Sequence, residues 1–235
     1  MKFEQTHRPR TSALSILALG LTLLLLPSSQ AQTDQEFLGQ WLTAQEHLTS
    51  WSAELVQTRH LPSLTRPLTA PGRVWFTAPD RFRWELGQPA QSIAVRSGND
   101  LLLLSPRLKR GERYPLGRVE AGPMKNALAL LDTGFPRDAA EFRKRFELLS
   151  VNRTNALLEF RVRPRAASAR NLMPGLTLWV ATNSWNLTAT ELQFTDGSRM
   201  RNDFTNALNN PRNDPALFTP LLDATWKISE PSRQP

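Results

Sequence analysis

The sequence predicts an α+β fold, mainly β, in which one long antiparallel sheet of about ten or eleven strands is accompanied by three helices. Residues Arg81–Leu86 alternate polar and apolar side chains without exception, which is typical of a strand with one buried face. Turn signals separate similar segments at intervals of about eight to twelve residues, as in an antiparallel meander. Only three stretches carry the apolar spacing of a helix. The sheet therefore dominates the expected architecture.

Residues 1–31 have the pattern of an export signal. A basic segment, Met1–Arg10, precedes the apolar run Ala13–Leu26, and small residues flank a cleavage point after Ala31. The apolar run is short for a span of ~30 Å of hydrocarbon, although an uncleaved membrane anchor is the alternative. We therefore expect residues 32–235 to be a single domain that is soluble in the periplasm.

Three segments have helical patterning. Apolar side chains recur at helical spacing in Asp34–Thr49, where Asp34 is placed to cap the helix. Pro123–Leu131 has a proline near its start and a glycine beyond its end. Asp138–Arg145 is expected to be capped by Asp138. One helix thus precedes the sheet, and two interrupt it.

The remaining segments are mostly extended. Leu61–Gly72 holds three prolines and is expected to be a loop or a broken edge. Asn209–Pro215 is a second loop, rich in Asn and Pro. The expected strands are Trp51–Thr58, Arg73–Ala78, Arg81–Leu86, Ser92–Arg96, Leu101–Leu104, Arg113–Val119, Phe146–Val151, Ala156–Arg163, Leu176–Thr182, Leu187–Phe194 and Ser198–Phe204. The segments Leu217-Phe218 and Thr225–Ile228 close the chain.

The aromatic residues indicate an apolar cavity. The chain has 7 Trp and 11 Phe but only 1 Tyr, a balance that suits a wall in contact with hydrocarbon. Alternation places Phe82, Trp84 and Leu86 on one face of their strand, opposite Arg81 and Arg83. A long sheet curls, and helices that fill its inner face only partly leave a cavity. An ordinary packed core is the plainer interpretation of any single aromatic residue.

The composition argues against several classes of site. With no cysteine, the chain has no disulfide, no cysteine metal ligand or nucleophile, and no lipid attached through cysteine. Neither His47 nor His60 has a second ligand at metal-binding spacing. Hydrolase, zinc-protease, dinucleotide and phosphate-loop motifs are absent. We therefore expect no enzyme, no metal and no cofactor.

The chain is basic, with a formal net charge of +8, and 24 of its 29 basic residues are arginine. Such a balance favours anionic partners such as lipid headgroups or acidic proteins. Arg161 and Arg163 alternate with apolar residues, which a solvated outer face explains. Nucleic acid is disfavoured as a partner because the charge is spread along an exported chain without a recognition motif.

The order of motifs between residues 72 and 106 resembles the LolA family of periplasmic outer-membrane lipoprotein carriers. The resemblance extends over essentially all of residues 32–235 and is carried by the order and spacing of several short pieces. These pieces are Gly72-Arg73-Val74-Trp75-Phe76, Pro79, Phe82-Arg83-Trp84, Gln88-Pro89, Ser92-Ile93-Ala94-Val95, Gly98, Leu101–Leu104 and Pro106.

The resemblance implies an incomplete (half) antiparallel β-barrel whose helices cover an apolar cavity. It also implies a soluble carrier that binds the acyl chains of lipoproteins and shuttles them from the inner to the outer membrane. An inner-membrane ABC-type lipoprotein-releasing complex (LolCDE-like) would be the donor, and an outer-membrane receptor (LolB-like) a possible acceptor. The carrier would be a monomer. A periplasmic lipid-binding sensor or scaffold with the same fold, without transport, is the alternative.

The expected site follows from the resemblance and the alternation together. In LolA proteins of well-known bacteria an arginine precedes the Pro turn and bonds the lid helices, whereas this chain has Ala78 there. Arg59 and Arg73 are the candidates to hold the lid in its place. Leu128 and Leu131 are expected to form the lid. The expected cavity residues are Val74, Phe76, Phe82, Trp84, Leu86, Ile93, Val95, Leu102, Leu128 and Leu131.

Overall fold

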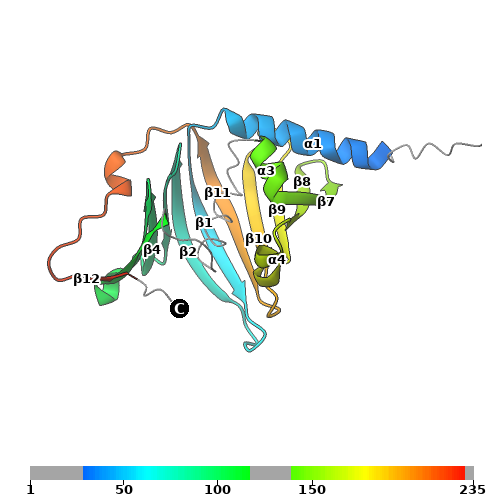
Figure 1. Cartoon of the computed structure of the whole chain (residues 1–235). Coiled ribbons are helices and arrows are strands. Elements are labelled where there is room, and N and C mark those ends of the chain that lie inside the picture. Colours follow the sequence, from blue (N-terminus) through cyan, green and yellow to red (C-terminus); the bar gives the residue numbers. More distant parts are fainter. Residues whose placement is uncertain (1–28, 117–138, 231–235) are drawn as a thin grey trace, which may run out of the picture.

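The computed structural model describes residues 29–116 and 139–230, and its described part is built on a single sheet of 12 strands (Figure 1). The strand order is β12-β6-β5-β4-β3-β2-β1-β11-β10-β9-β8-β7. Neighbouring strands are antiparallel except for β12, which runs parallel to β6. The strands are β1 Ser50–His60, β2 Leu68–Thr77, β3 Arg81–Leu86, β4 Ser92–Ser97, β5 Asp100–Ser105, β6 Arg110–Pro115, β7 Phe146–Arg153, β8 Leu157–Pro164, β9 Gly175–Ala181, β10 Leu187–Gln193, β11 Arg199–Asn209 and β12 Lys227–Ser229.

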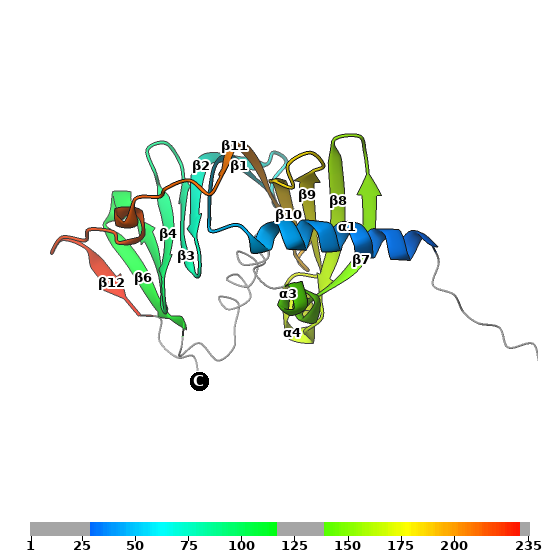
Figure 2. The ribbon, with the colours of Figure 1, turned by 90° about the horizontal axis from the view of Figure 1, so that it is seen from above.

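The sheet curves into an open arc, and the helices lie on its concave side (Figure 2). The described helices are α1 Ser29–Glu46, α3 Ala139–Arg145 and α4 Ala167–Leu172, with short 3-10 turns η1 Pro106–Leu108 and η3 Pro215–Phe218. The order of strands in the sheet is linear, with β12 at one edge and β7 at the other, so the described sheet is not closed. The predicted mainly-β fold with an incomplete barrel is confirmed, with twelve strands where the sequence predicts ten or eleven.

Helix α1 packs across the concave face through Leu38, Trp41 and Leu42, all of which are buried. The Trp41 ring stacks on Phe160 of β8, with 5.7 Å between ring centroids. The predicted capping role of Asp34 is wrong, because Asp34 lies inside α1. Its Oδ2 instead accepts a hydrogen bond of 3.1 Å from the backbone N–H of Val151. Asp34 therefore ties the helix to the edge strand β7.

Strand β2 begins at Leu68, so the prediction of a loop over Leu61–Gly72 is wrong for its last five residues. Pro71 is tolerated because its carbonyl faces the β3 side, where it accepts a hydrogen bond from Gly87 N–H at 2.7 Å. In a strand, the N–H and the carbonyl of one residue point to the same neighbouring strand. Because the carbonyl of Pro71 points toward β3, the lack of an N–H at this proline removes no hydrogen bond to β1. Gly72 fits because a Cβ there would lie 2.1 Å from the carbonyl oxygen of Glu85.

Helix α4 was not expected from the sequence, since its six residues are too few to show an apolar period. The predicted helix Pro123–Leu131, the cap at Asp138 and residues 117–119 of the predicted strand Arg113–Val119 lie outside the described residues. The other two predicted helices correspond to α1 and α3.

A buried polar chain crosses three central strands. Gln57 Nε2 of β1 donates to Asn202 Oδ1 of β11 at 3.0 Å, and Asn202 Nδ2 donates to Thr190 Oγ1 of β10 at 3.0 Å. All three side chains are buried. Because buried polar groups are costly without partners, this chain fixes the register of β1, β11 and β10.

Candidate functional site

Strand register decides which side chains share the concave face of the sheet. Val74 of β2 is paired with Trp84 of β3, and Phe76 is paired with Phe82. Leu86 lies opposite Gly72. Directly paired residues point to the same side, so these five predicted cavity residues share one face. Val74 and Trp84 belong to the same core cluster as α1, which places that face on the concave side.

The apolar surface continues from this group in both directions. Toward β6, Phe82 and Leu101 form a buried cluster against which Leu103 and Tyr114 pack. Toward β11, the Trp84 ring meets Phe204 edge-on at 6.0 Å between centroids. Phe204 and Leu103 are therefore part of the candidate site, although neither is among the cavity residues predicted from the sequence. The signal for Leu103 was the apolar run Leu101–Leu104, which is typical of a strand covered on both faces.

The prediction that Ile93, Val95 and Leu102 line the same wall is wrong. Ile93 is paired with Glu85, and Val95 is paired with both Arg83 and Leu102, so all three point to the convex side. Alternation within one strand shows which residues share a face but not which face is concave. Leu128 and Leu131 lie outside the described residues, so the lid role of that segment stays a prediction.

A C-terminal strap, residues 210–229, covers the convex side of β3–β5 and ends as β12 at the sheet edge beside β6. Asn213 Nδ2 donates to the carbonyl oxygen of Phe76 at 2.9 Å, and Phe218 is buried. Arg83 points outward as expected, but it lies beneath the strap: its Nε contacts Glu85 Oε1 at 2.5 Å and its Nη1 donates to Leu217 O at 3.0 Å. This covering explains why the convex sides of β4 and β5 are apolar.

The strap and the sheet enclose a cleft of about 430 Å³ on the convex side. This cleft lies on the opposite side of the sheet from Trp84 and Leu103. Its lining comprises Arg83, Glu85, Ile93, Leu104, Pro106, Asp214, Ala216, Leu217, Pro220, Leu221, Leu222 and Trp226.

The two arginines considered for holding a lid lie in different settings. Arg73 faces the convex side, where it pairs with Glu54 at 3.5 Å, so its candidacy is wrong. Arg59 is exposed near the end of β1 and its role stays a prediction. Ala78 is partly buried, and its N–H donates to Thr49 O at 2.8 Å. This bond joins the end of β2 to the segment before β1.

One ionisable pair lies next to the apolar surface, on β6. Tyr114 Oη donates to a carboxylate oxygen of Glu112, two residues earlier on the same strand. This hydrogen bond, aided by partial burial and by the negative charge of Glu112, raises the pKa of Tyr114 to about 12. Tyr114 therefore remains neutral at physiological pH.

The described residues offer no metal-binding cluster of three or more His, Cys, Asp or Glu side chains. His47 and His60 are exposed. In the same part of the chain, no helix combines the length and apolarity needed to cross a membrane.

Comparison with known proteins agrees with this picture. The family model described as outer membrane lipoprotein carrier protein LolA matches residues 46–220. The chain belongs to the LolA family. The resemblance seen in the motifs between residues 72 and 106 is therefore confirmed. The matched range contains every described strand except β12.

One curated relative in the LolA family is the outer-membrane lipoprotein carrier protein of Chromohalobacter salexigens. It is 35% identical over 101 residues, which are 43% of this chain and 47% of that protein. The match thus spans about half the length of the curated relative.

Solved structures are similar to this chain at low sequence identity. An uncharacterized conserved protein from Thermus thermophilus has a TM-score of 0.50 and 9% identity, with 84% of this chain and 99% of that one covered. A LolA superfamily protein from Nitrosomonas europaea has a TM-score of 0.40 and 10% identity, covering 78% and 97%.

Proposed function

We propose that this LolA-family chain is a periplasmic carrier that holds the acyl chains of lipoproteins against the concave face of its sheet. The observation that carries the proposal is the apolar surface from Phe204 through Trp84 and Phe82 to Leu103. Arg96 of β4, which is paired with both Phe82 and Leu101, faces the same side. In this surface Trp84 and Leu103 are only half-buried among the described residues, so apolar area remains for a ligand to cover.

The energetics require such a surface. Each CH₂ transferred from water contributes about 0.8 kcal/mol, so one C16 chain held in a membrane represents on the order of 12 kcal/mol. Spontaneous release into water is negligible, and a shuttle must offer comparable apolar contact. The carrier accordingly acts by binding rather than by catalysis, receives cargo from an ABC-type releasing complex at the inner membrane, and delivers it to an outer-membrane receptor or to that membrane directly.

Two adjacent leucines provide a matched test of the binding face. Leu103 faces the concave side and Leu102 the convex side, and both are half-buried. Leu103→Glu places a charge in the proposed wall and should weaken binding of a palmitoylated peptide by about tenfold or more, because an unpaired carboxylate is costly there. Leu102→Glu should change the affinity by less than about twofold. Fluorescence titration measures both, and circular dichroism checks the fold.

Equal loss of affinity in both variants, or none in either, would show that the concave face is not the lipid site. Transport is tested separately with inner-membrane vesicles that contain a triacylated lipoprotein and the releasing complex. A carrier moves the lipoprotein into the supernatant when ATP is added. A chain that binds the peptide but releases no lipoprotein would be a sensor or scaffold instead.

A further inference from the structure

The positive charge of the chain is concentrated in one part of the fold. Residues 139–172, which include α3, β7, β8 and α4, contain eight Lys and Arg against three Glu. This segment alone carries +5 of the formal net charge of +8. Seven of its eight basic residues are arginine, the side chain whose planar fork binds phosphate through two hydrogen bonds.

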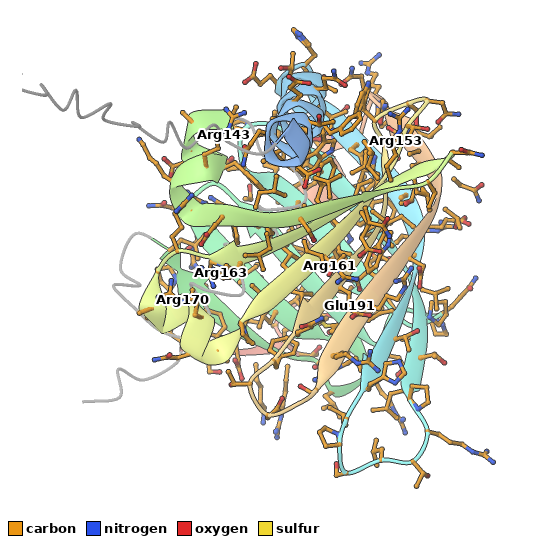
Figure 3. All side chains as sticks on the ribbon, turned by 90° about the vertical axis from the view of Figure 1, so that its right-hand side faces the viewer. Arg143, Arg153, Arg161, Arg163, Arg170 and Glu191 are labelled. Carbon is orange, nitrogen blue, oxygen red and sulfur yellow. The ribbon has the colours of Figure 1, made fainter. Side chains whose placement is uncertain are left out.

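Most of these side chains lie on one side of the molecule, called here the arginine face. Figure 3 shows five of its arginines from that side, on α3, β7, β8 and α4. Arg161 and Arg163 extend from the outer side of β8, because Phe160 and Val162, which alternate with them along the strand, are buried. The arginine face comprises Arg143, Arg153, Arg161, Arg163 and Arg170, which Figure 3 labels, and Arg165, whose charge acts on Glu147 beside Arg163.

The acidic side chains in this segment leave a surplus of positive charge. Arg163 Nε contacts Glu147 Oε2 at 2.8 Å, and Arg161 Nε contacts Glu159 Oε1 at 2.7 Å. The hydrogen bond from Arg163, with the nearby charges of Arg165 and Arg170, holds the pKa of Glu147 below its usual range. Three positive charges thus act on the single carboxylate of Glu147.

An apolar side chain lies within the same surface. The register of β7 against β8 shifts between Leu148 and Ser150, which leaves Leu149 unpaired in a β-bulge. Leu148 packs into the core, so Leu149 turns to the outer side, where it is 51% exposed. Leu149 thus lies on β7 beside the strand that carries Arg161 and Arg163. An exposed leucine near arginines is the combination found on surfaces that bind the membrane interface.

We propose that the arginine face binds the phosphate headgroups of an anionic phospholipid bilayer. The guanidinium groups match the phosphates, and Leu149 supplies a contact with the acyl boundary that an acidic protein surface would not require. Binding here would bring the edge strand β7 and the helices of the concave side close to a membrane. This inference does not depend on the carriage of lipoproteins, because no cargo takes part in it.

The test compares two charge-reversed double variants of the full chain as purified from its host. Arg161→Glu/Arg163→Glu changes the arginine face, where these side chains are 62% and 48% exposed. Arg73→Glu/Arg113→Glu is the matched control: these side chains are 61% and 48% exposed, and each also has one carboxylate partner. Both variants lower the net charge equally. Co-sedimentation is measured with vesicles of phosphatidylcholine alone and with vesicles in which a third of the lipid is phosphatidylglycerol.

The wild type and the control should bind the phosphatidylglycerol vesicles. The affinity of the arginine-face variant for these vesicles should be lower by about tenfold or more. Added salt should weaken binding. Leu149→Ser should lower the affinity without changing the salt dependence. Equal loss in both double variants would overturn the proposal, as would wild-type binding that ignores phosphatidylglycerol. Tighter binding to a polyglutamate peptide than to the vesicles would assign the face to an acidic protein instead.

Discussion

Leu102 and Leu103 illustrate how much depends on the direction of a single side chain. They are neighbours in the chain, and both are apolar and half-buried, yet Leu103 joins the concave cluster of Phe82 while Leu102 joins the convex cluster beneath the strap. At the scale of single residues, membership of the proposed binding wall therefore depends on which of the two alternating faces of its strand a side chain occupies.

Tyr114 is the only tyrosine of the chain, so the change in absorbance that accompanies tyrosine ionisation reports on this residue alone. We expect a titration midpoint of about 12, because the hydrogen bond to Glu112 favours the neutral phenol. Since this pKa lies above the unfolded value of about 10, the bond stabilises the fold fully below pH ~10 and is lost as pH rises through ~12.

Ultraviolet difference absorbance measures the Tyr114 midpoint. Glu112→Gln removes the negative charge and should return the midpoint toward 10. A wild-type midpoint near 10 would contradict the hydrogen bond between Tyr114 and Glu112.

Trp41 anchors α1 to the sheet, with its ring fully buried between Phe142 and Phe160. Trp41→Ala should lower the free energy of unfolding by about 3–5 kcal/mol, because it removes the contacts and leaves a cavity. Among described residues its Nε1 has no hydrogen-bond partner, so Trp41→Phe should cost less than half as much. Urea denaturation followed by circular dichroism measures both. A loss below about 1 kcal/mol for Trp41→Ala would show that α1 is not anchored there.

At the scale of elements, polar contacts join strands that the apolar pattern alone does not order. Asn202 of β11 lies between Gln57 of β1 and Thr190 of β10, strands far apart in the chain. These bonds specify which strands are neighbours at the middle of the sheet. The bond between Gln57 and Asn202 thereby joins a strand of the N-terminal half to a strand of the C-terminal half.

Asn202→Ala should destabilise the fold by about 1–3 kcal/mol, since it leaves the Gln57 donor and the Thr190 hydroxyl buried without their partner. Asn202→Ala combined with Thr190→Val should cost less than the sum of the two single changes, because the residues share one bond. Asn152→Ala, exposed near the end of β7, is the control and should stay within about 0.5 kcal/mol of the wild type. Additive losses in the double variant would mean that the bond contributes nothing.

At the scale of the whole molecule, different segments cover the two sides of one sheet. The helices lie on the concave side (Figure 2). The C-terminal strap covers part of the convex side through η3 and then joins the edge of the sheet as β12. Arg81 lies over the ring of Phe218 at 5.5 Å from the centroid, which helps to hold the strap. The proposed lipid wall and the strap therefore have no side chains in common.

Phe218→Ala should loosen the strap without changing the concave face. Hydrogen exchange over Pro215–Ser229 is expected to quicken, because Phe218 is the buried anchor of η3. Affinity for the palmitoylated peptide should remain within about twofold of the wild type. A large loss of affinity in this variant would show that the two faces are coupled.

The sequence by itself determined the chemistry of each strand. The alternation in Arg81–Leu86 separated Phe82, Trp84 and Leu86 from Arg81 and Arg83 correctly, because a period of two is a local property of the backbone. The order of motifs between residues 72 and 106 indicated the family. Tertiary structure alone decided which face became concave, since facing depends on pairing with distant strands. Ile93, Val95 and Leu102 were misplaced for that reason: a strap more than 100 residues further along the chain covers the convex side and makes it apolar too.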